Sequence, residues 1–121
     1  MPAPVVIVHQ ESDAREMLLQ AVRDAGHEAV GFDDPLRALE AIDAGSRTHV
    51  LVTRVDFGEG KLNGGALARM LRYNRHYDIK VVFVGRTANE HYVDGQGEFI
   101  PHPVDPKSVA EAVGRLLSAS E

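Results

Sequence analysis

The sequence predicts a parallel α/β fold in one domain that spans residues 1–121. The first observation is that its apolar runs are short and rich in Val and Ile, which is typical of strands covered on both faces. The second is that stretches with apolar residues every three or four positions, as on one side of a helix, alternate with these runs. Such units, joined by right-handed crossovers, form a doubly wound sheet with helices on both faces.

The first strand and helix have clear ends. Residues 5–8 (Val-Val-Ile-Val) are too apolar for a strand with a solvated face, so a central strand is expected. Ser12 is a good N-cap residue, and Gly26 stands where a helix would end in the left-handed conformation. The apolar residues between them, Met17 and Ala25 included, form one stripe that is expected to face the core. A weaker second strand follows at Glu28 to Phe32.

The second helix and the third strand are equally short. Asp34 precedes Pro35, a pair that supplies an N-cap and a first helical residue, and the helix is expected to end near Gly45. Residues 50–53 (Val-Leu-Val-Thr) form a buried third strand. A glycine-rich loop follows, up to Gly65.

The remaining units are less uniform. Asn63-Gly64 opens a third helix, and residues 79–84 give the clearest strand signal in the chain. Residues 85–97 contain few apolar side chains, so the fourth helix is expected to be short or irregular. Residues 98–100 form a fifth strand, and Asp105-Pro106 begins the last helix.

Charge and composition limit the classes of function. Lys and Arg number 13 against 18 Asp and Glu, so the net charge is -5, which argues against broad binding of nucleic acid or of an anionic membrane. There are no cysteines, which excludes a disulfide framework, a thiolate metal site and a cysteine nucleophile. No apolar run is long enough to span a membrane, and no signal sequence is visible. We therefore expect a cytoplasmic protein that binds another protein.

Polar residues gather where the strands are expected to end. In doubly wound sheets, ligands bind beyond the carboxyl ends of the strands, where the strand order reverses. The residues at these ends are His9, Gln10 and Glu11 after the first strand, Arg54 and Asp56 at or just past the third, Gly85 after the fourth and His102 after the fifth. No Ser-His-Asp set or pair of carboxylates stands among them, so enzyme activity is not expected.

Several features together resemble the receiver domain of bacterial response regulators. They are five strand and helix units in 121 residues, the polar cluster 9–11 after Val-Val-Ile-Val, Asn63-Gly64 before the third helix, and Pro103 with Asp105-Pro106 before the last one. Phe99 stands where that family has an aromatic switch residue. The resemblance covers nearly the whole chain. It implies a CheY-like, flavodoxin-like fold with five parallel strands in the order 2-1-3-4-5, and a role in two-component or phosphorelay signal transduction.

The residues that carry phosphotransfer in that family are absent at the matching positions. The family has an acidic pair after strand one, an aspartate phosphoacceptor ending strand three, a Thr or Ser after strand four and a Lys after strand five, with Mg²⁺ held by the carboxylates. The matching residues in this chain are His9 and Gln10 for the acidic pair, Arg54 for the phosphoacceptor, Gly85 for the hydroxyl residue and His102 for the lysine. The resemblance therefore implies a degenerate receiver.

The charge of this set points the same way. Three aspartates and one lysine carry about -2, whereas the four polar residues here carry about +1 when both histidines are neutral. A guanidinium repels Mg²⁺ and stays protonated, so it cannot accept a phosphoryl group. We expect no Mg²⁺ or other cofactor, and Arg54 paired with Glu11 or Asp56 as the local positive charge. The predicted function is a phosphorylation-independent interaction module, a pseudo-receiver, that binds a signalling protein or forms a homodimer.

Two other interpretations of these residues are open. If the third strand extended two residues further, Asp56 would stand at its end and could be the phosphoacceptor of an active receiver. His9 and His102, expected on either side of the third strand, could instead bind a transition metal, or form a sensor of a metal or small anion together with Arg54. The simpler interpretation is that both histidines are hydrogen-bonded to backbone or water, because no third metal ligand is evident.

Two further patterns have simple explanations. The glycine-rich segment 58–65 lacks the glycine and the Ser/Thr that a phosphate-binding P-loop requires, because Val55 and Leu62 occupy those positions. A basic run in the third helix is expected to be its solvated face and end. This run comprises Arg69, Arg72, Arg75 and His76, beside Tyr73 and Tyr77.

Overall fold

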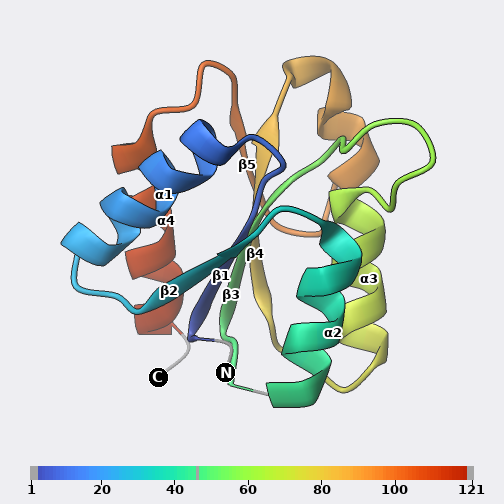
Figure 1. Ribbon diagram of the computed structural model, residues 1–121, viewed down its shortest axis with the longest axis horizontal. Helices are drawn as coiled ribbons and strands as arrows, with labels where there is room; N and C mark the ends of the chain where they lie inside the picture. Colours follow the sequence, from blue (N-terminus) through green and yellow to red (C-terminus); the bar gives the residue numbers. More distant parts are fainter. Residues whose placement is uncertain (1–2, 46, 120–121) are drawn as a thin grey trace.

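Strands and helices alternate along the chain in the computed structural model, which describes residues 3–45 and 47–119. The strands are β1 (Val5–Val8), β2 (Ala29–Phe32), β3 (Val50–Arg54), β4 (Lys80–Gly85) and β5 (Glu98–Pro101). The helices are α1 (Ser12–Asp24), α2 (Pro35–Gly45), α3 (Gly64–Tyr73), the 3-10 helix η1 (Thr87–Val93) and α4 (Pro106–Ala119). Figure 1 shows this order of elements along the chain, and it confirms the order predicted from the sequence.

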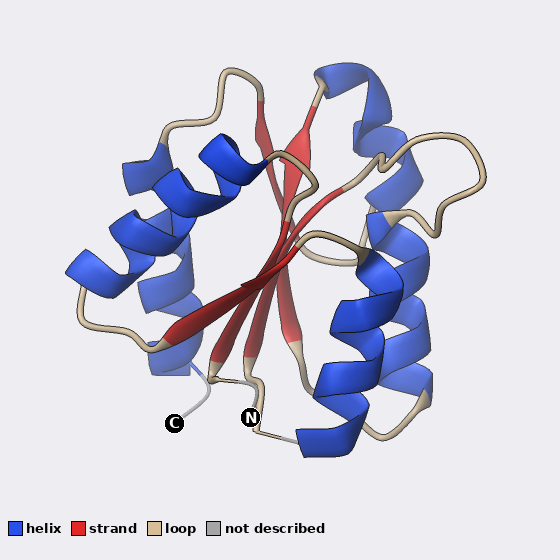
Figure 2. Ribbon diagram, in the orientation of Figure 1, coloured by secondary structure: helices blue, strands red, loops and turns tan. Residues whose placement is uncertain are grey.

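The five strands, red in Figure 2, run parallel in one sheet with the order β2-β1-β3-β4-β5. This is the predicted order. The chain adds β2 on one side of β1 and β3 on the other, so the order of strands reverses at β1. Val8 of β1 pairs with Thr53 of β3, and Arg54 of β3 pairs with Val84 of β4. The carboxyl ends of these strands therefore lie together, at the top of Figure 1.

Helices cover both faces of the sheet, with α1 and α4 on one face and α2, α3 and η1 on the other (Figure 1). Alternate residues of β1 belong to two separate cores, as the two-residue period of a strand requires. Val5 and Ile7 pack with α1 and α4, whereas Val6 and Val8 pack with α2 and α3. Continuing this alternation, the next residue, His9, is directed toward the α1 and α4 face.

Three predicted helix boundaries are confirmed by backbone geometry and hydrogen bonds. Gly26 follows α1 with φ +96°, the left-handed conformation that glycine adopts without strain. At the start of α2, the carboxylate of Asp34 accepts the N–H of Leu36 at 3.1 Å. At the start of α3, the side chain of Asn63 accepts the N–H of Ala66 at 2.8 Å.

The start of α1 differs from the prediction by one residue. Ser12 is the first helical residue, and Glu11 is the N-cap, with φ -86° and ψ 122°. The N–H of Arg15 donates to the Glu11 carbonyl oxygen at 2.9 Å, which closes the first turn. The Glu11 side chain makes no capping hydrogen bond, so it is free to pair with a residue elsewhere.

The segment between β4 and β5 forms η1 instead of an α-helix. Val93 is the one buried residue of η1, in agreement with the few apolar side chains in this part of the sequence. The prediction of a short or irregular fourth helix is therefore confirmed. Among the described residues, no helix has the length and apolar character needed to cross a membrane.

Candidate functional site

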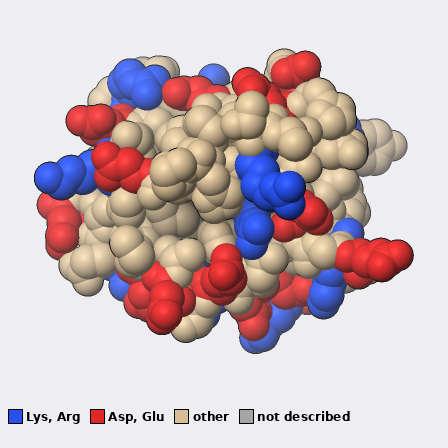
Figure 3. All heavy atoms as spheres, turned by 90° about the horizontal axis from the view of Figure 1, so that it is seen from above, with Lys and Arg blue, Asp and Glu red and all other residues tan. Residues whose placement is uncertain are grey.

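The carboxyl ends of the strands bring most of the predicted site residues to one end of the sheet. Figure 3 looks down on this end and shows a group of Lys and Arg atoms beside Asp and Glu atoms near the middle of a mostly uncharged face. His9 directly follows β1 and Arg54 ends β3, and they are neighbours because Val8 pairs with Thr53. His9 and Arg54 therefore form the centre of the candidate site.

His9 is buried, with only 3% of its surface exposed. Its Nδ1 accepts the backbone N–H of Glu11 at 3.1 Å, and the guanidinium of Arg15 donates to its carbonyl oxygen at 2.9 Å. Burial, and next the positive charge of Arg54, lower the pKa of His9 from 6.5 to about 4. His9 is thus a neutral imidazole at pH 7 that is hydrogen-bonded to backbone, as the simpler interpretation predicts.

Arg54 is paired with Glu11, one of the two partners expected from the sequence. Its Nη1 lies 3.3 Å from the Glu11 Oε1, and the two side chains are 21% and 66% exposed. The other expected partner, Asp56, accepts the N–H of Gly58 at 2.9 Å and so belongs to the following loop. A fixed positive charge therefore stands at the end of β3, beside β1.

Asp56 does not stand at the end of a strand. β3 ends at Arg54, and Asp56 is an exposed residue of the loop that leads to α3. The extension of β3 by two residues, which the interpretation of Asp56 as a phosphoacceptor requires, is absent from the described structure. That interpretation has no structural support.

The expectation that His9 and His102 flank the third strand is wrong. β5 pairs with β4, so β4 lies between His102 and β3. His102 is exposed, and its backbone N–H donates to the carbonyl oxygen of Gly85 at 2.8 Å. The His102-Pro103 peptide bond is cis and leads into the loop before α4.

Two other predicted residues lie at the margin of this site. Gln10 is exposed between β1 and α1. Phe99, at the position of the aromatic switch in receivers, is partly buried and packs against the core under α2 and α3. Its role as a switch stays a prediction.

The residues at this end of the sheet do not fit the Mg²⁺ that a receiver fold implies. Mg²⁺ prefers carboxylate oxygens, whereas the imidazole of His9 follows β1, the guanidinium of Arg54 ends β3, and the Glu11 carboxylate is already paired. Within residues 3–45 and 47–119, no group of three or more His, Asp or Glu side chains is placed to hold a metal ion. A metal held by His9 and His102 would therefore lack further ligands from the described part of the chain.

Replacing Glu11 with alanine is expected to change the free energy of unfolding by less than about 0.5 kcal/mol, since its carboxylate is mostly exposed and screened by solvent. The hydrogen bond from Glu11 to His9 comes from the backbone and stays in the variant. Urea unfolding measures the change. A loss above about 1 kcal/mol would instead show that the ion pair holds this end of the sheet together.

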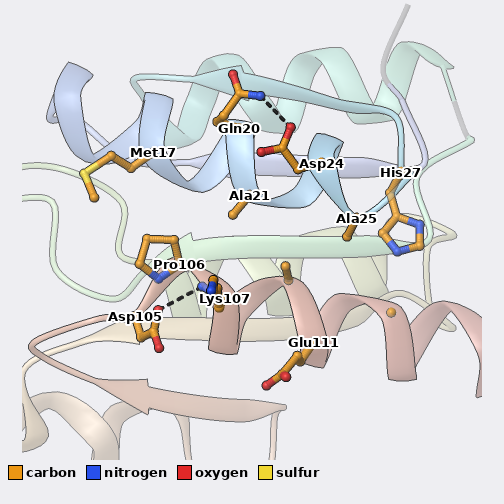
Figure 4. Close-up of a pocket in the computed structure, with 12 residues that line it drawn as sticks. Met17, Gln20, Ala21, Asp24, Ala25, His27, Asp105, Pro106, Lys107 and Glu111 are labelled. Carbon is orange, nitrogen blue, oxygen red and sulfur yellow. Dashed lines mark hydrogen bonds between the residues drawn. The ribbon is translucent and has the colours of Figure 1, made fainter.

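A groove between α1 and α4 is a feature that the sequence analysis missed. Its volume is about 730 Å³, and Figure 4 shows Met17 and Pro106 at one end and His27 at the other. Met17 is 58% exposed and Ala25 is exposed, so their assignment to the core is wrong. The available signal is the spacing of Met17, Ala21 and Ala25, which places one apolar row along α1. None of the predicted site residues lines this groove.

The basic run from Arg69 to His76, which begins in α3 and ends beyond it, is only partly solvated. His76 lies in the turn after α3 and is 7% exposed, and its Nε2 lies 3.0 Å from the Asp43 Oδ1 of α2, so it links this turn to α2. Arg72 donates to the carbonyl oxygen of Ile79 at 3.1 Å. The prediction of a solvated run is therefore wrong for His76, and Arg69 and Arg75 are its exposed members.

The fold is that of response regulator receiver domains of known structure. The chain matches the chemotaxis protein CheY4 of Vibrio cholerae over 96% of its own length and 99% of that chain, with 17% identity and a TM-score of 0.81. It matches the receiver domain of NtrX from Brucella abortus over 94% and 98%, with 23% identity and a TM-score of 0.82. It also matches a response regulator receiver domain protein of Clostridium thermocellum over 98% and 96%, with 14% identity and a TM-score of 0.84. No protein-family model and no curated protein matches the sequence significantly.

Proposed function

We propose that this chain is a receiver-like module of two-component signalling that accepts no phosphoryl group and acts through protein contacts. The observation that carries the proposal is the guanidinium of Arg54 at the end of β3, 3.3 Å from the carboxylate of Glu11. Phosphotransfer to a receiver needs a nucleophilic carboxylate and a divalent cation at this place. A guanidinium is not a nucleophile and repels the cation. The shared fold with CheY4 and with the NtrX receiver domain supports a role in signalling.

The exposed surface suits a module that works by binding. Several large apolar and aromatic side chains are exposed, among them Tyr73 at 90%, Tyr77 at 79% and Met17 at 58%. Tyr and Met are enriched in protein interfaces because they cover much apolar area with few polar groups to desolvate. The partner is accordingly a signalling protein or a second copy of this chain.

The wild-type protein is expected to show no change in its amide NMR spectrum when Mg²⁺ and beryllofluoride are added together. The reason is that Arg54 supplies the positive charge that the cation would otherwise bring. Incubation with acetyl phosphate should likewise add no mass. Shifts centred on the carboxyl ends of β1 and β3, or labelling that Asp56→Asn abolishes, would contradict the proposal.

A matched variant tests whether the right positions have been identified. His9→Asp, Gln10→Asp and Arg54→Asp together place carboxylates at the positions where receivers have them. This variant is expected to bind Mg²⁺, with amide shifts at residues 9–11 and 54, while the wild type does not. If the variant folds and still does not bind Mg²⁺, the assignment of these positions is wrong, and so is the proposal.

A further inference from the structure

A small apolar cavity lies beside the candidate site, on the face of the sheet that α1 and α4 cover. It is open to solvent on one side and has a volume of about 190 Å³ between the start of α1, the end of β4 and the loop before α4. Its walls include Ala14, Met17, Val84 and Val104, and two imidazoles, His9 and His102, also line it. The cavity is separate in its chemistry from the Arg54-Glu11 ion pair, because neither of those side chains lines it.

The imidazole of His9 has one ring nitrogen that no protein group satisfies. Since Nδ1 accepts the N–H of Glu11, the proton of the neutral ring is on Nε2, which makes Nε2 a hydrogen-bond donor. In the described part of the chain, Nε2 makes no hydrogen bond with the protein. Every fully buried side-chain nitrogen or oxygen among the described residues does have a partner, so Nε2 is not one of the fully buried atoms. Nε2 is therefore not sealed inside the protein, and His9 is one of the residues that line the cavity.

We propose that this cavity binds a small neutral molecule that has one apolar ring and one hydrogen-bond acceptor, with the acceptor on Nε2 of His9. His9 is only 3% exposed, so the packing around the ring fixes the direction of this donor before a ligand arrives. The hydrogen bond from Glu11 holds the ring in this orientation. Apolar walls with one oriented polar group are the usual composition of a small-molecule site.

The size and the walls of the cavity define the class of ligand. An engineered apolar cavity of about 150 Å³ binds benzene, so about 190 Å³ accommodates one ring with a carbonyl or ether substituent. A carboxylate would lose its hydration against apolar walls, and the neutral N–H of His9 would only partly replace it, which disfavours an anion. The neutral state of His9, whose pKa lies at about 4, favours a neutral acceptor for the same reason.

The cavity also adjoins the groove between α1 and α4. Met17 and Pro106 line both, and Figure 4 shows them at one end of the groove. Met17 is flexible and 58% exposed, so it can move aside for a ligand at little cost in packing. An occupant of the cavity therefore touches side chains that belong to the exposed surface of the module.

The test uses acetophenone as the probe and amide NMR of the full chain as the measurement. Acetophenone should shift the signals of residues at the start of α1, the end of β4 and the loop before α4, with a Kd in the range of about 0.1–1 mM. Ethylbenzene has the same shape without the acceptor and should bind about tenfold more weakly. Benzoate, which adds a negative charge, should also bind more weakly than acetophenone.

Two variants in α1 separate the cavity from the neighbouring groove. Ala14→Leu fills the cavity and should weaken acetophenone binding by at least about tenfold. Ala25→Leu adds the same atoms to the groove alone and should leave the Kd unchanged. His9→Phe keeps a ring and removes the donor, so acetophenone and ethylbenzene should bind it equally; if it does not fold, the comparison of the two probes on the wild type tests the donor.

Several results would overturn the proposal. They are no shifts up to the solubility limit of acetophenone, shifts that centre on the groove and vanish in Ala25→Leu, or equal affinity of the wild type for acetophenone and ethylbenzene. Tighter binding of benzoate would show that the site takes anions and that the assignment of a neutral ligand is wrong. None of these results bears on the absence of phosphotransfer, which the Mg²⁺ and beryllofluoride titration tests separately.

Discussion

Replacing Gly64 with alanine is expected to lower the free energy of unfolding by about 3 kcal/mol. A Cβ atom at Gly64 would lie against the carbonyl oxygen of Arg54, closer than real Cβ contacts, and 3.1 Å from the Cγ2 of Thr53. The N–H of Gly64 donates to the carbonyl oxygen of Val55 at 2.8 Å, so the start of α3 is tied to the end of β3. Helix α3 cannot move away to make room without losing this hydrogen bond.

The expected loss is a balance of two opposing effects. Alanine favours a helix over glycine by about 1 kcal/mol in a helix interior, and this effect alone would make the variant more stable. The steric conflict outweighs it because the opposing atom is backbone of β3, which pairs with both β1 and β4 and cannot rotate aside as a side chain could. The net sign is therefore destabilising.

Gly85→Ala is the matched control for this prediction. Gly85 is also buried at the carboxyl end of a strand, but its nearest neighbour would be the Val55 Cγ2 at 3.7 Å, an ordinary contact. The control is expected to change the free energy of unfolding by less than about 1 kcal/mol. Urea unfolding of both variants, with the slope compared to that of the wild type, gives the two values.

The same experiment tests how the candidate site is built. Because the conflict falls on the backbone of Arg54, the amide NMR shifts of Gly64→Ala should centre on Arg54 and on its paired neighbour in β4, Val84. If Gly64→Ala is as stable as the wild type, or no less stable than Gly85→Ala, then α3 does not approach β3 as closely as described. The placement of Arg54 would then need revision.

Most of the fold could be predicted because its signals are local. Each strand is a short apolar run, and residues such as Asp34 and Asn63 mark helix starts by hydrogen bonds to amides two or three residues away. The start of α1 was missed by one residue because Glu11 and Ser12 are both able to be the residue before the first turn. The exposure of Met17 was missed since helical periodicity alone does not show how wide the buried stripe is.

The site was predicted only in part, because it depends on contacts between distant segments. That polar residues gather at one edge follows from the parallel strands alone. The choice of Glu11 over Asp56 as the partner of Arg54 depends on the loop after β3, where Asp56 instead accepts the N–H of Gly58. The burial of His9 depends on α1, whose Arg15 bonds to the His9 carbonyl oxygen, and periodicity in one strand contains no information about that contact.

The pH dependence of stability is expected to reveal the burial of His9. In the unfolded chain, the imidazole has its ordinary pKa of 6.5, whereas in the fold, burial and then Arg54 lower the pKa to about 4. As pH falls below 6.5, the unfolded chain binds a proton before the folded chain does, so protonation favours unfolding. The stabilisation is therefore complete above pH 6.5 and is lost as the pH falls toward 4.

The size of this effect follows from the difference between the two pKa values. At about 1.4 kcal/mol per pKa unit, the step from 6.5 to about 4 corresponds to a loss of about 3 kcal/mol between pH 7 and pH 4. Other groups titrate in the same range, so the measurement is the difference between the wild type and His9→Gln. Glutamine is neutral at every pH and keeps a side-chain oxygen that can accept the N–H of Glu11.

His9→Gln is expected to lose about 3 kcal/mol less than the wild type over this range, as measured by urea unfolding at several pH values. The ring signals of His9 in the folded wild type should titrate with a midpoint near pH 4. Parallel stability curves for the two proteins, together with a midpoint near the ordinary value of 6.5, would mean that His9 is solvated. A solvated His9 would no longer be a fixed neutral hydrogen-bond donor. This measurement therefore also tests the donor on which the proposed ligand site beside β1 depends.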